Sequence, residues 1–220
     1  MIEAVLFDLD GTLIDTNELI IQSFLHTLDG VSSQSSQHVT RAQIIEQMGL
    51  PLAEQLQMFT GLDEVEELIV KYRRYNVDMH DELVEEFPNV YDVLKDMQAQ
   101  GIRMGIVTNK VRNTTEMGLR LCRLDKLMEC VVTVDDVKKG KPDPEAVRLA
   151  LHKLQVAPEK AVMIGDSHYD ILTAKAAGVQ SIGVGWSLKG ADYLQTFQPD
   201  AMIGDIRELP DILKAMRDRV

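Results

Sequence analysis

The 220-residue sequence contains little cysteine, no long apolar run and fewer basic than acidic residues. Its two cysteines, Cys122 and Cys130, match no metal-binding spacing and offer no disulfide framework, so we expect two reduced, buried thiols. No stretch approaches the ~20 apolar residues of a membrane span, and the first residues lack the basic and long apolar segments of a secretion signal. We therefore expect a cytoplasmic protein. With 45% hydrophobic residues, it can build a core without disulfides.

The shortage of positive charge excludes two classes of partner. The chain has 23 Lys and Arg against 35 Asp and Glu, a net charge of -12. Nucleic-acid binding depends on clustered cations that neutralise phosphates, and docking on anionic lipid depends on the same kind of cluster. We therefore expect neither nucleic acid nor a membrane as a partner.

Short apolar runs alternate with helical patterns along most of the chain. The runs have the length of strands and occupy residues 4–7, 102–107, 131–134, 161–164, 181–184 and 201–203. They lack strict alternation, which is typical of parallel strands buried on both faces. One helical pattern starts at Asp143-Pro144, and another runs over residues 167–177 and ends at Gly178. The pattern predicts an α/β fold built on a doubly wound parallel sheet.

One segment, residues 15–85, interrupts this alternation with several helical patterns and no confident strand. Thr40 and Asp63 each begin a sequence that resembles a capping box at the start of a helix. The segment contains 13 acidic and 4 basic side chains, so it carries most of the net negative charge, which is typical of a solvated acidic surface. We predict a helical insert at 15–85 within an α/β core made of residues 1–14 and 86–220.

Four polar clusters follow strands of the predicted sheet. They are Asp8-Leu9-Asp10-Gly11-Thr12, Thr108-Asn109, Gly140-Lys141-Pro142 and Gly165-Asp166-Ser167-His168-Tyr169-Asp170. Each cluster alone has an ordinary explanation, since such residues also form turns, helix caps and solvent contacts. Ligands of doubly wound sheets bind outside the carboxyl ends of the strands. The combination therefore predicts one site for a phosphate-bearing ligand.

In this order, the four clusters resemble the motifs of the haloacid dehalogenase (HAD) superfamily of phosphatases, which implies a Rossmann-like core with an inserted helical cap. The resemblance implies that Asp8 is a nucleophile that forms an aspartyl-phosphate and that Asp10 is the general acid and base. It also implies a Mg²⁺ ion bound by Asp8, by the backbone carbonyl of Asp10, by Asp166 and, directly or through water, by Asp170.

The same resemblance implies a set of substrate-binding residues. Thr108 and neighbouring amides would hold the transferred phosphoryl group, and Lys141 would neutralise charge on it and on Asp8. Gly11 and Asn109 would complete the substrate-binding set.

Four longer segments resemble the bacterial inorganic pyrophosphatases within this superfamily. They are residues 15–21, 72–84, 133–137 and 185–190. This resemblance implies hydrolysis of inorganic pyrophosphate to two phosphates. It also implies a source of that pyrophosphate, the dephosphorylation of a serine-phosphorylated carrier protein of sugar uptake.

Within the insert, Arg73 and His80 are the candidates for contacts with the substrate. The simpler interpretation is a surface arginine and a helix-end histidine. A small polyanion would need positive groups from the insert. Besides Arg73, the basic residues of the insert are Arg41, Lys71 and Arg74. We therefore expect pyrophosphate to arrive already complexed with Mg²⁺.

The sequence leaves several alternatives. A phosphoglycolate phosphatase has a similar cap, and residues 48–51 resemble the substrate loop of both families. Sugar phosphomutases of the superfamily carry a histidine twelve residues after the nucleophile, where this chain has Ile20. A non-catalytic phosphate-binding protein would be free to lose Asp8 or Asp10. A dinucleotide-binding fingerprint is disfavoured because Leu188 stands in place of its third glycine.

Overall fold

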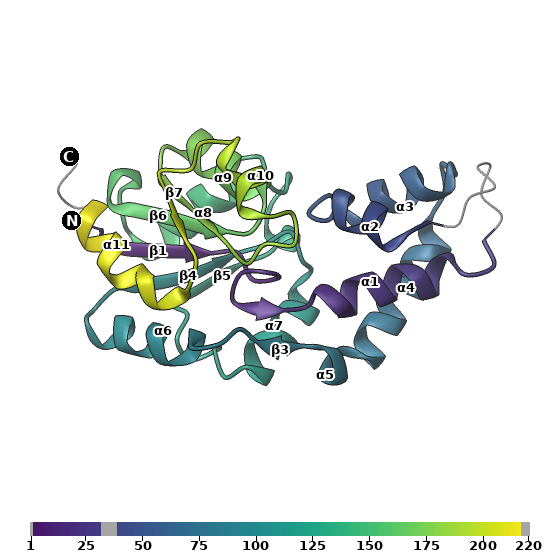
Figure 1. The fold of residues 1–220 in the computed structure, drawn as a ribbon, viewed down its shortest axis with the longest axis horizontal. Coiled ribbons are helices and arrows are strands. Elements are labelled where there is room, and N and C mark those ends of the chain that lie inside the picture. The colour runs from purple at the N-terminus through teal and green to yellow at the C-terminus, as the bar shows by residue number, and fades with distance from the viewer. Residues whose placement is uncertain (1, 32–38, 217–220) are drawn as a thin grey trace. The chain divides into compact units, whose positions relative to one another are not determined.

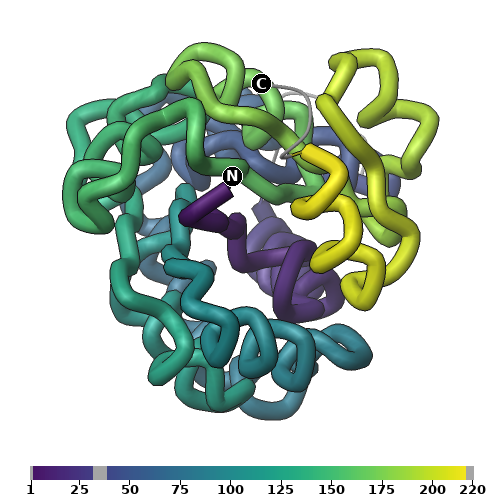
Figure 2. Tube along the Cα trace, turned by 90° about the vertical axis from the view of Figure 1, so that its left-hand side faces the viewer, coloured from purple at the N-terminus to yellow at the C-terminus, as the bar shows by residue number. Residues whose placement is uncertain are grey.

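Six short, strongly apolar segments form the central sheet of the computed structural model, which describes residues 2–31 and 39–216. The strands are β1 (Ala4–Phe7), β4 (Arg103–Val107), β5 (Cys130–Val132), β6 (Ala161–Gly165), β7 (Gln180–Val184) and β8 (Ala201–Ile203). Their order is β5-β4-β1-β6-β7-β8, and all neighbours are parallel. The sequence-based prediction of a doubly wound parallel sheet is confirmed. In Figure 2, the first residues of the chain lie between later teal and green segments, as the central place of β1 requires.

Helices cover both faces of this sheet. They are α6 (Val90–Ala99), α7 (Arg112–Leu121), α8 (Glu145–Leu154), α9 (His168–Ala177), α10 (Ala191–Gln195) and α11 (Leu209–Met216), with 3-10 turns η1 (Val134–Asp136), η2 (Pro158–Lys160) and η3 (Ile206–Glu208). Figure 1 shows α8 and α9 on one side of the sheet and α6 on the other. Side chains of α8 such as Val147 and Leu151 pack with Leu6 and Met163 of the sheet. Full burial of a side chain of this size stabilises the fold by about 1.5–3 kcal/mol.

Two predicted element ends differ slightly from the structure. Strand β5 ends at Val132 and not at residue 134, because the Thr133 N–H and hydroxyl both donate to Asp136 Oδ2 and turn the chain into η1. Helix α8 begins at Glu145, whose N–H donates to Asp143 Oδ1. The predicted carboxylate thus lies beside the helix start, but the N-cap residue is Pro144, which has no side-chain cap.

The chain divides into two compact units. The first contains the described residues up to Asp15 and from Glu85 onward, and the second contains those from Thr16 to Val84. At the boundary of the first unit, β2 (Ile14–Asp15) pairs antiparallel with β3 (Glu85–Glu86). Two residues are too few to give a strand pattern, so sequence reasoning missed this pair.

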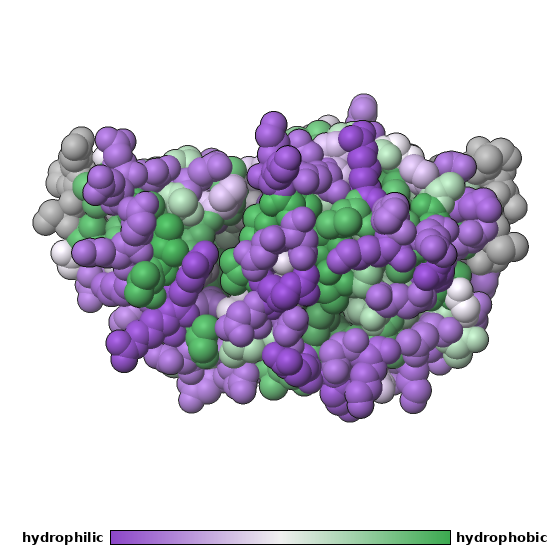
Figure 3. Space-filling view, turned by 180° about the vertical axis from the view of Figure 1, so that it is seen from behind, coloured by the Kyte–Doolittle hydropathy of each residue, from purple (hydrophilic) through white to green (hydrophobic). Residues whose placement is uncertain are grey.

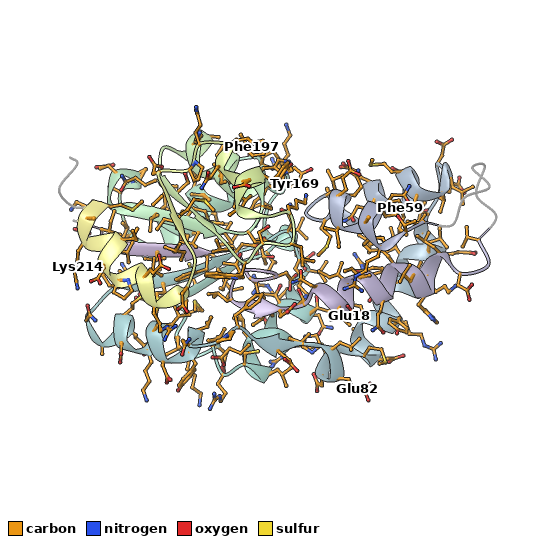
Figure 4. All side chains as sticks on the ribbon, viewed as in Figure 1. Glu18, Phe59, Glu82, Tyr169, Phe197 and Lys214 are labelled. Carbon is orange, nitrogen blue, oxygen red and sulfur yellow. The ribbon has the colours of Figure 1, made fainter. Side chains whose placement is uncertain are left out.

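The second unit consists of helices. They are α1 (Asn17–Leu28), α2 (Arg41–Gln47), α3 (Leu52–Thr60), α4 (Glu66–Asp78) and α5 (His80–Leu83). Its centre holds Phe24, which lies edge-on to Phe59, labelled in Figure 4, with ring centroids 5.5 Å apart. Ile44 and Leu56 are fully buried in the same cluster. The unit therefore has an apolar core of its own.

Of the two predicted capping boxes, one is confirmed and one is wrong. The Thr40 hydroxyl accepts from the Gln43 N–H, and the Gln43 side chain accepts from the Thr40 N–H, so α2 begins as predicted. Helix α4 begins three residues after Asp63, with Val65 at its N-cap. Burial of Val65 in the second core sets this start, while the Asp63 carbonyl accepts from the Gln57 amide.

The remaining general expectations concern the surface and the thiols. Hydrophilic side chains stand out across the face in Figure 3, with hydrophobic atoms visible between them. Within residues 2–31 and 39–216, the helices are too short or too polar to cross a bilayer. Cys122 and Cys130 are free and buried, as predicted, and burial raises the pKa of each thiol to about 11.

Candidate active site

Three neighbouring strands of the sheet end at the same level and deliver polar residues to one edge. Phe7 at the end of β1 pairs with Ile106 of β4 and with Ile164 of β6. The ladder continues one residue further, since the Asp8 N–H donates to the Ile164 carbonyl at 2.8 Å. Thr108 follows β4 in the same way. Because the three strands end side by side, polar clusters that are far apart in the sequence lie at the same edge of the sheet.

Lys141 is the buried centre of the site. Its Nζ donates to Asp8 Oδ1 at 2.6 Å and to Asp170 Oδ1 at 2.5 Å, and the lysine side chain is only 4% exposed. The Asn109 side chain fixes its backbone, because Asn109 Oδ1 accepts from the Lys141 N–H at 2.7 Å and Nδ2 donates to the Lys141 carbonyl at 3.0 Å. A Cβ at Gly140 would lie 2.6 Å from Asn109 Oδ1. Glycine at that position therefore leaves room for the Asn109 side chain to make both hydrogen bonds. The Lys141–Pro142 peptide is cis.

Asp170 joins a helix start to the site. Its Oδ2 accepts from the Ser167 N–H at 3.0 Å and from the Ser167 hydroxyl at 2.7 Å, which is the capping role that its position in the first turn of α9 predicts. Its other oxygen accepts from Lys141. A Cβ at Gly165 would lie 2.2 Å from the Asp170 carboxyl carbon. Asp170 thus serves the helix and the site at once.

Three carboxylates converge beside this lysine. One oxygen from each of Asp8, Asp166 and Asp170 can be chosen so that all lie within 4.8 Å of one another. Gly11 makes room for Asp166, because its φ is +77° and a Cβ there would lie 2.5 Å from Asp166 Oδ2. The Ser187 hydroxyl donates to the Asp166 carbonyl at 2.6 Å and holds that backbone in place. The cluster has the oxygen ligands that hard cations prefer.

Crowding and burial shift the protonation of these groups. Burial, opposed by Lys141 and helped by Asp170, raises the pKa of Asp8 to about 7. Burial and the neighbouring Asp8 raise the pKa of Asp166 well above its usual range. For Lys141, burial acts to lower the pKa, but Asp170 and Asp8 outweigh it and raise the pKa above the ordinary value. The lysine is therefore charged, and the carboxylates compete for too little positive charge.

We expect Asp8→Asn to stabilise the cation-free protein at pH 8. The pKa of Asp8 is 3.8 unfolded and about 7 folded, so the folded state binds the extra proton and stability falls as pH rises between these values. Three units of pKa set an upper limit of about 4 kcal/mol on the gain in free energy of unfolding. Urea unfolding in chelator at pH 8, 7, 6 and 5 should show the gain shrinking as Asp8 regains its proton.

The exposed Asp125 provides the control for this measurement, since Asp125→Asn should leave the free energy of unfolding unchanged at each pH. If Asp8→Asn were less stable than the wild type at pH 8 in chelator, the ionised Asp8 carboxylate would not destabilise the cation-free fold, and the prediction would be wrong.

Lys110 is a residue of the site that sequence reasoning missed. Its Nζ donates to Asp10 Oδ1 at 2.8 Å, and its backbone N–H donates to Thr108 Oγ1 at 3.1 Å. The available signal was its position directly after Asn109. Most lysines in loops are exposed to solvent, so that position alone was no reason to select Lys110 as a site residue.

The charges at this edge of the sheet do not balance. When ionised, Asp8, Asp10, Asp166 and Asp170 carry four negative charges, against two positive charges on Lys110 and Lys141. A divalent cation with oxygen ligands would close the difference of two. Mg²⁺ fits this donor set, because it is bound in proteins by one or two carboxylates and keeps several waters.

Comparison with known proteins identifies the family. A profile of haloacid dehalogenase-like hydrolases matches residues 5–184. The chain belongs to this family. It is therefore a hydrolase, and the match includes the polar clusters and the second unit.

Individual relatives match this haloacid dehalogenase-like hydrolase over almost the whole length of both chains. The pyrophosphatase PpaX of Bacillus anthracis is 47% identical over 217 residues, 98% of this chain and 98% of that protein. A haloacid dehalogenase-like family hydrolase from Streptococcus pneumoniae has a TM-score of 0.83 and 26% identity over 96% of this chain and 98% of that one. A Lactobacillus plantarum protein, proposed to be a phosphoglycolate phosphatase, has a TM-score of 0.84 and 26% identity over 96% and 99%.

Haloacid dehalogenase-like hydrolases generally use Mg²⁺, and this member has the acidic cluster to hold it. Asp8, Asp166 and Asp170 supply the carboxylates, and Asp10 lies two residues after Asp8. Thr108 is 4% exposed, and its hydroxyl accepts from the backbone N–H of Lys110, whose side chain contacts Asp10. All the predicted site residues of the core except Gly11 and Asn109 thus offer a charged or hydroxyl group at this edge.

The two candidates of the helical insert differ in exposure. Arg73 is exposed on α4, whereas His80, the first residue of α5, is fully buried. His80 Nδ1 lies 2.8 Å from Asp81 Oδ1, and within the described residues its Nε2 has no hydrogen-bond partner. Their role as substrate contacts of the hydrolase stays a prediction.

Proposed function

We propose that this hydrolase is a Mg²⁺-dependent inorganic pyrophosphatase that works through an aspartyl-phosphate on Asp8. The observation that carries the proposal is the arrangement of Asp8, a buried carboxylate held by Lys141 beside an acidic cluster and two residues before Asp10. The name of the B. anthracis relative supports pyrophosphate as the substrate. The two free, buried thiols fit a reducing compartment such as the cytoplasm.

The first step uses the two oxygens of Asp8 differently. Oδ1 accepts from Lys141, which leaves Oδ2 to attack phosphorus. The new O–P bond forms as the bond to the bridging oxygen breaks, and Asp10 gives its proton to that oxygen. One phosphate leaves, and the other stays on Asp8. The Lys141 ammonium and the Thr108 hydroxyl stabilise charge on the transferred group.

The second step returns Asp8 to its starting state. Asp10 takes a proton from a water molecule, which attacks the phosphorus of the aspartyl-phosphate, and the bond to Asp8 breaks. A bound Mg²⁺ would neutralise charge on the phosphoryl oxygens and on the acidic cluster. An acyl phosphate hydrolyses readily, so a carboxylate is a suitable carrier for the group.

The resemblance to bacterial pyrophosphatases also supports a physiological source. In that proposal the pyrophosphate comes from dephosphorylation of a serine-phosphorylated carrier protein of sugar uptake. The second candidate function is phosphoglycolate hydrolysis, which the fold of the L. plantarum protein favours.

A substrate panel separates the two candidates. We expect kcat/KM for pyrophosphate to exceed the values for phosphoglycolate and p-nitrophenyl phosphate at least about tenfold, or ~1.4 kcal/mol of transition-state binding. Phosphate release is measured at saturating Mg²⁺, with Asp8→Asn prepared in parallel to reveal contaminating phosphatases. A tenfold preference for phosphoglycolate would instead establish the second candidate.

A further inference from the structure

Lys110 forms a partly buried ion pair that the steps above leave without a function. Its Nζ lies 2.8 Å from Asp10 Oδ1, and the two side chains are 11% and 19% exposed. Exposed ion pairs are common and contribute little, but this pair is shielded from water and contacts the residue that handles protons. The contact joins residues 100 positions apart.

The lysine backbone is fixed at two points. Its N–H donates to Thr108 Oγ1 at 3.1 Å, and its carbonyl accepts from the Val134 N–H at 3.3 Å. The chain therefore sets where the ammonium group reaches, and the side chain needs little further ordering when a ligand binds.

The ammonium group of Lys110 has N–H donors that Asp10 does not use. An ammonium carries three N–H donors and no acceptor. Within residues 2–31 and 39–216, Asp10 is the one side chain that accepts from Lys110 Nζ. Two donors remain for an anion beside Asp10.

The two lysines serve different sides of the reacting group. Lys141 contacts Asp8 and Asp170, so its charge lies on the side of the nucleophile. Lys110 contacts Asp10, which protonates the leaving oxygen, so its charge lies on the side of the leaving group. Given the proposed function, on which this inference rests, that leaving group is itself a phosphate.

We propose that Lys110 forms a subsite for the leaving phosphate of pyrophosphate. Its free N–H groups donate to the oxygens of that phosphate while Asp10 delivers the proton to the bridging oxygen. An anionic leaving group next to the Asp10 carboxylate would otherwise be repelled, more strongly in this shielded place than in water. Esters with an uncharged leaving group have no such need, so the subsite favours substrates with two linked phosphates.

The test compares two substrates in variants of Lys110. We expect Lys110→Gln to lower kcat/KM for pyrophosphate about 100-fold. The value for p-nitrophenyl phosphate should fall less than about fivefold, because its leaving group has no phosphate oxygens for Lys110 to bind and is a weak base that leaves without a proton from Asp10. Lys110→Arg keeps the charge and should retain more pyrophosphate activity than Lys110→Gln. Lys153→Gln removes an exposed charge on α8 and should change neither value.

An equal loss on both substrates would overturn the subsite, since it would mean that Lys110 acts only by holding Asp10. Failure of the proposed function looks different, because the wild type itself would then show no preference for pyrophosphate.

A binding measurement checks the subsite without turnover. Asp8→Asn and the double variant Asp8→Asn, Lys110→Gln are titrated with intact pyrophosphate and with inorganic phosphate by calorimetry in Mg²⁺. We expect the added Lys110 substitution to weaken pyrophosphate binding at least about tenfold and phosphate binding much less. Equal weakening of both ligands would count against the subsite. Circular dichroism verifies that each variant is folded, and Lys110→Met replaces Lys110→Gln if the latter is not.

Discussion

Asp8→Asn should lower turnover of every substrate of this site by about 10⁴-fold or more, because an amide oxygen is a very poor nucleophile toward phosphorus. The substitution is nearly isosteric, and the amide oxygen can still accept the hydrogen bond that Lys141 Nζ donates to Asp8 Oδ1 at 2.6 Å. Phosphate release at saturating Mg²⁺ measures the loss. Circular dichroism at the same Mg²⁺ concentration should show the variant folded, so that unfolding does not account for the loss.

A trapping experiment tests the intermediate directly. Acid quenching of the wild type during turnover of radiolabelled pyrophosphate should leave label on the protein, and hydroxylamine should remove it, as an acyl phosphate requires. Asp8→Asn should carry no label, whereas the surface variant Asp125→Asn should match the wild type. Retention of more than about one part in a hundred of the activity by Asp8→Asn would assign the nucleophile to another group.

The strands could be predicted from the sequence where a short apolar run indicates a strand that is buried on both faces. The apolar runs at β1 and β6 predict buried parallel strands within one residue of their ends. The end of β5 was predicted two residues late, because Thr133 and Asp136 close a turn that apolar character does not show. Apolar runs thus predict where strands lie better than where they stop.

The two capping boxes show the same limit for helices. Thr40 and Asp63 begin similar local sequences, yet only Thr40 caps a helix. The difference lies in Val65, whose side chain is buried in the second core and sets where α4 starts. A local pattern contains no information about which later side chain a distant core will bury.

For the site, sequence patterns could place residues at strand ends, but only the family resemblance paired Lys141 with Asp8. The register of β1 with β4 and β6 follows from buried strands, and it brings Asp8, Asp166 and Thr108 to one edge. The partner of Lys110 lies 100 positions away, and that of the Asp166 carbonyl, Ser187, lies 21 positions away. Such pairings depend on loop conformations, which carry no periodic signal.

Removal of divalent cations should lower kcat/KM for pyrophosphate at least about 10³-fold. Burial raises the pKa of Asp8 to about 7 and that of Asp166 well above its usual range, so without a cation both carboxylates tend to hold protons. A bound dication would lower both pKa values and, in the proposed mechanism, would keep Asp8 ionised for attack. The cation-free loss should therefore be larger at pH 6 than at pH 8, since Asp8 is more fully protonated at the lower pH.

The measurement uses enzyme treated with EDTA and passed into metal-free buffer, followed by titration with Mg²⁺ or Ca²⁺. Mg²⁺ should restore activity, and Ca²⁺ should bind with little turnover, because it takes 6–8 ligands at longer distances than the octahedral Mg²⁺. Asp166→Asn should raise the Mg²⁺ concentration for half-activation at least about tenfold, whereas Asp125→Asn should not change it. Full activity in enzyme shown by elemental analysis to be metal-free would mean that Lys110 and Lys141 alone neutralise the four carboxylates, and the charge argument for the cation would be wrong.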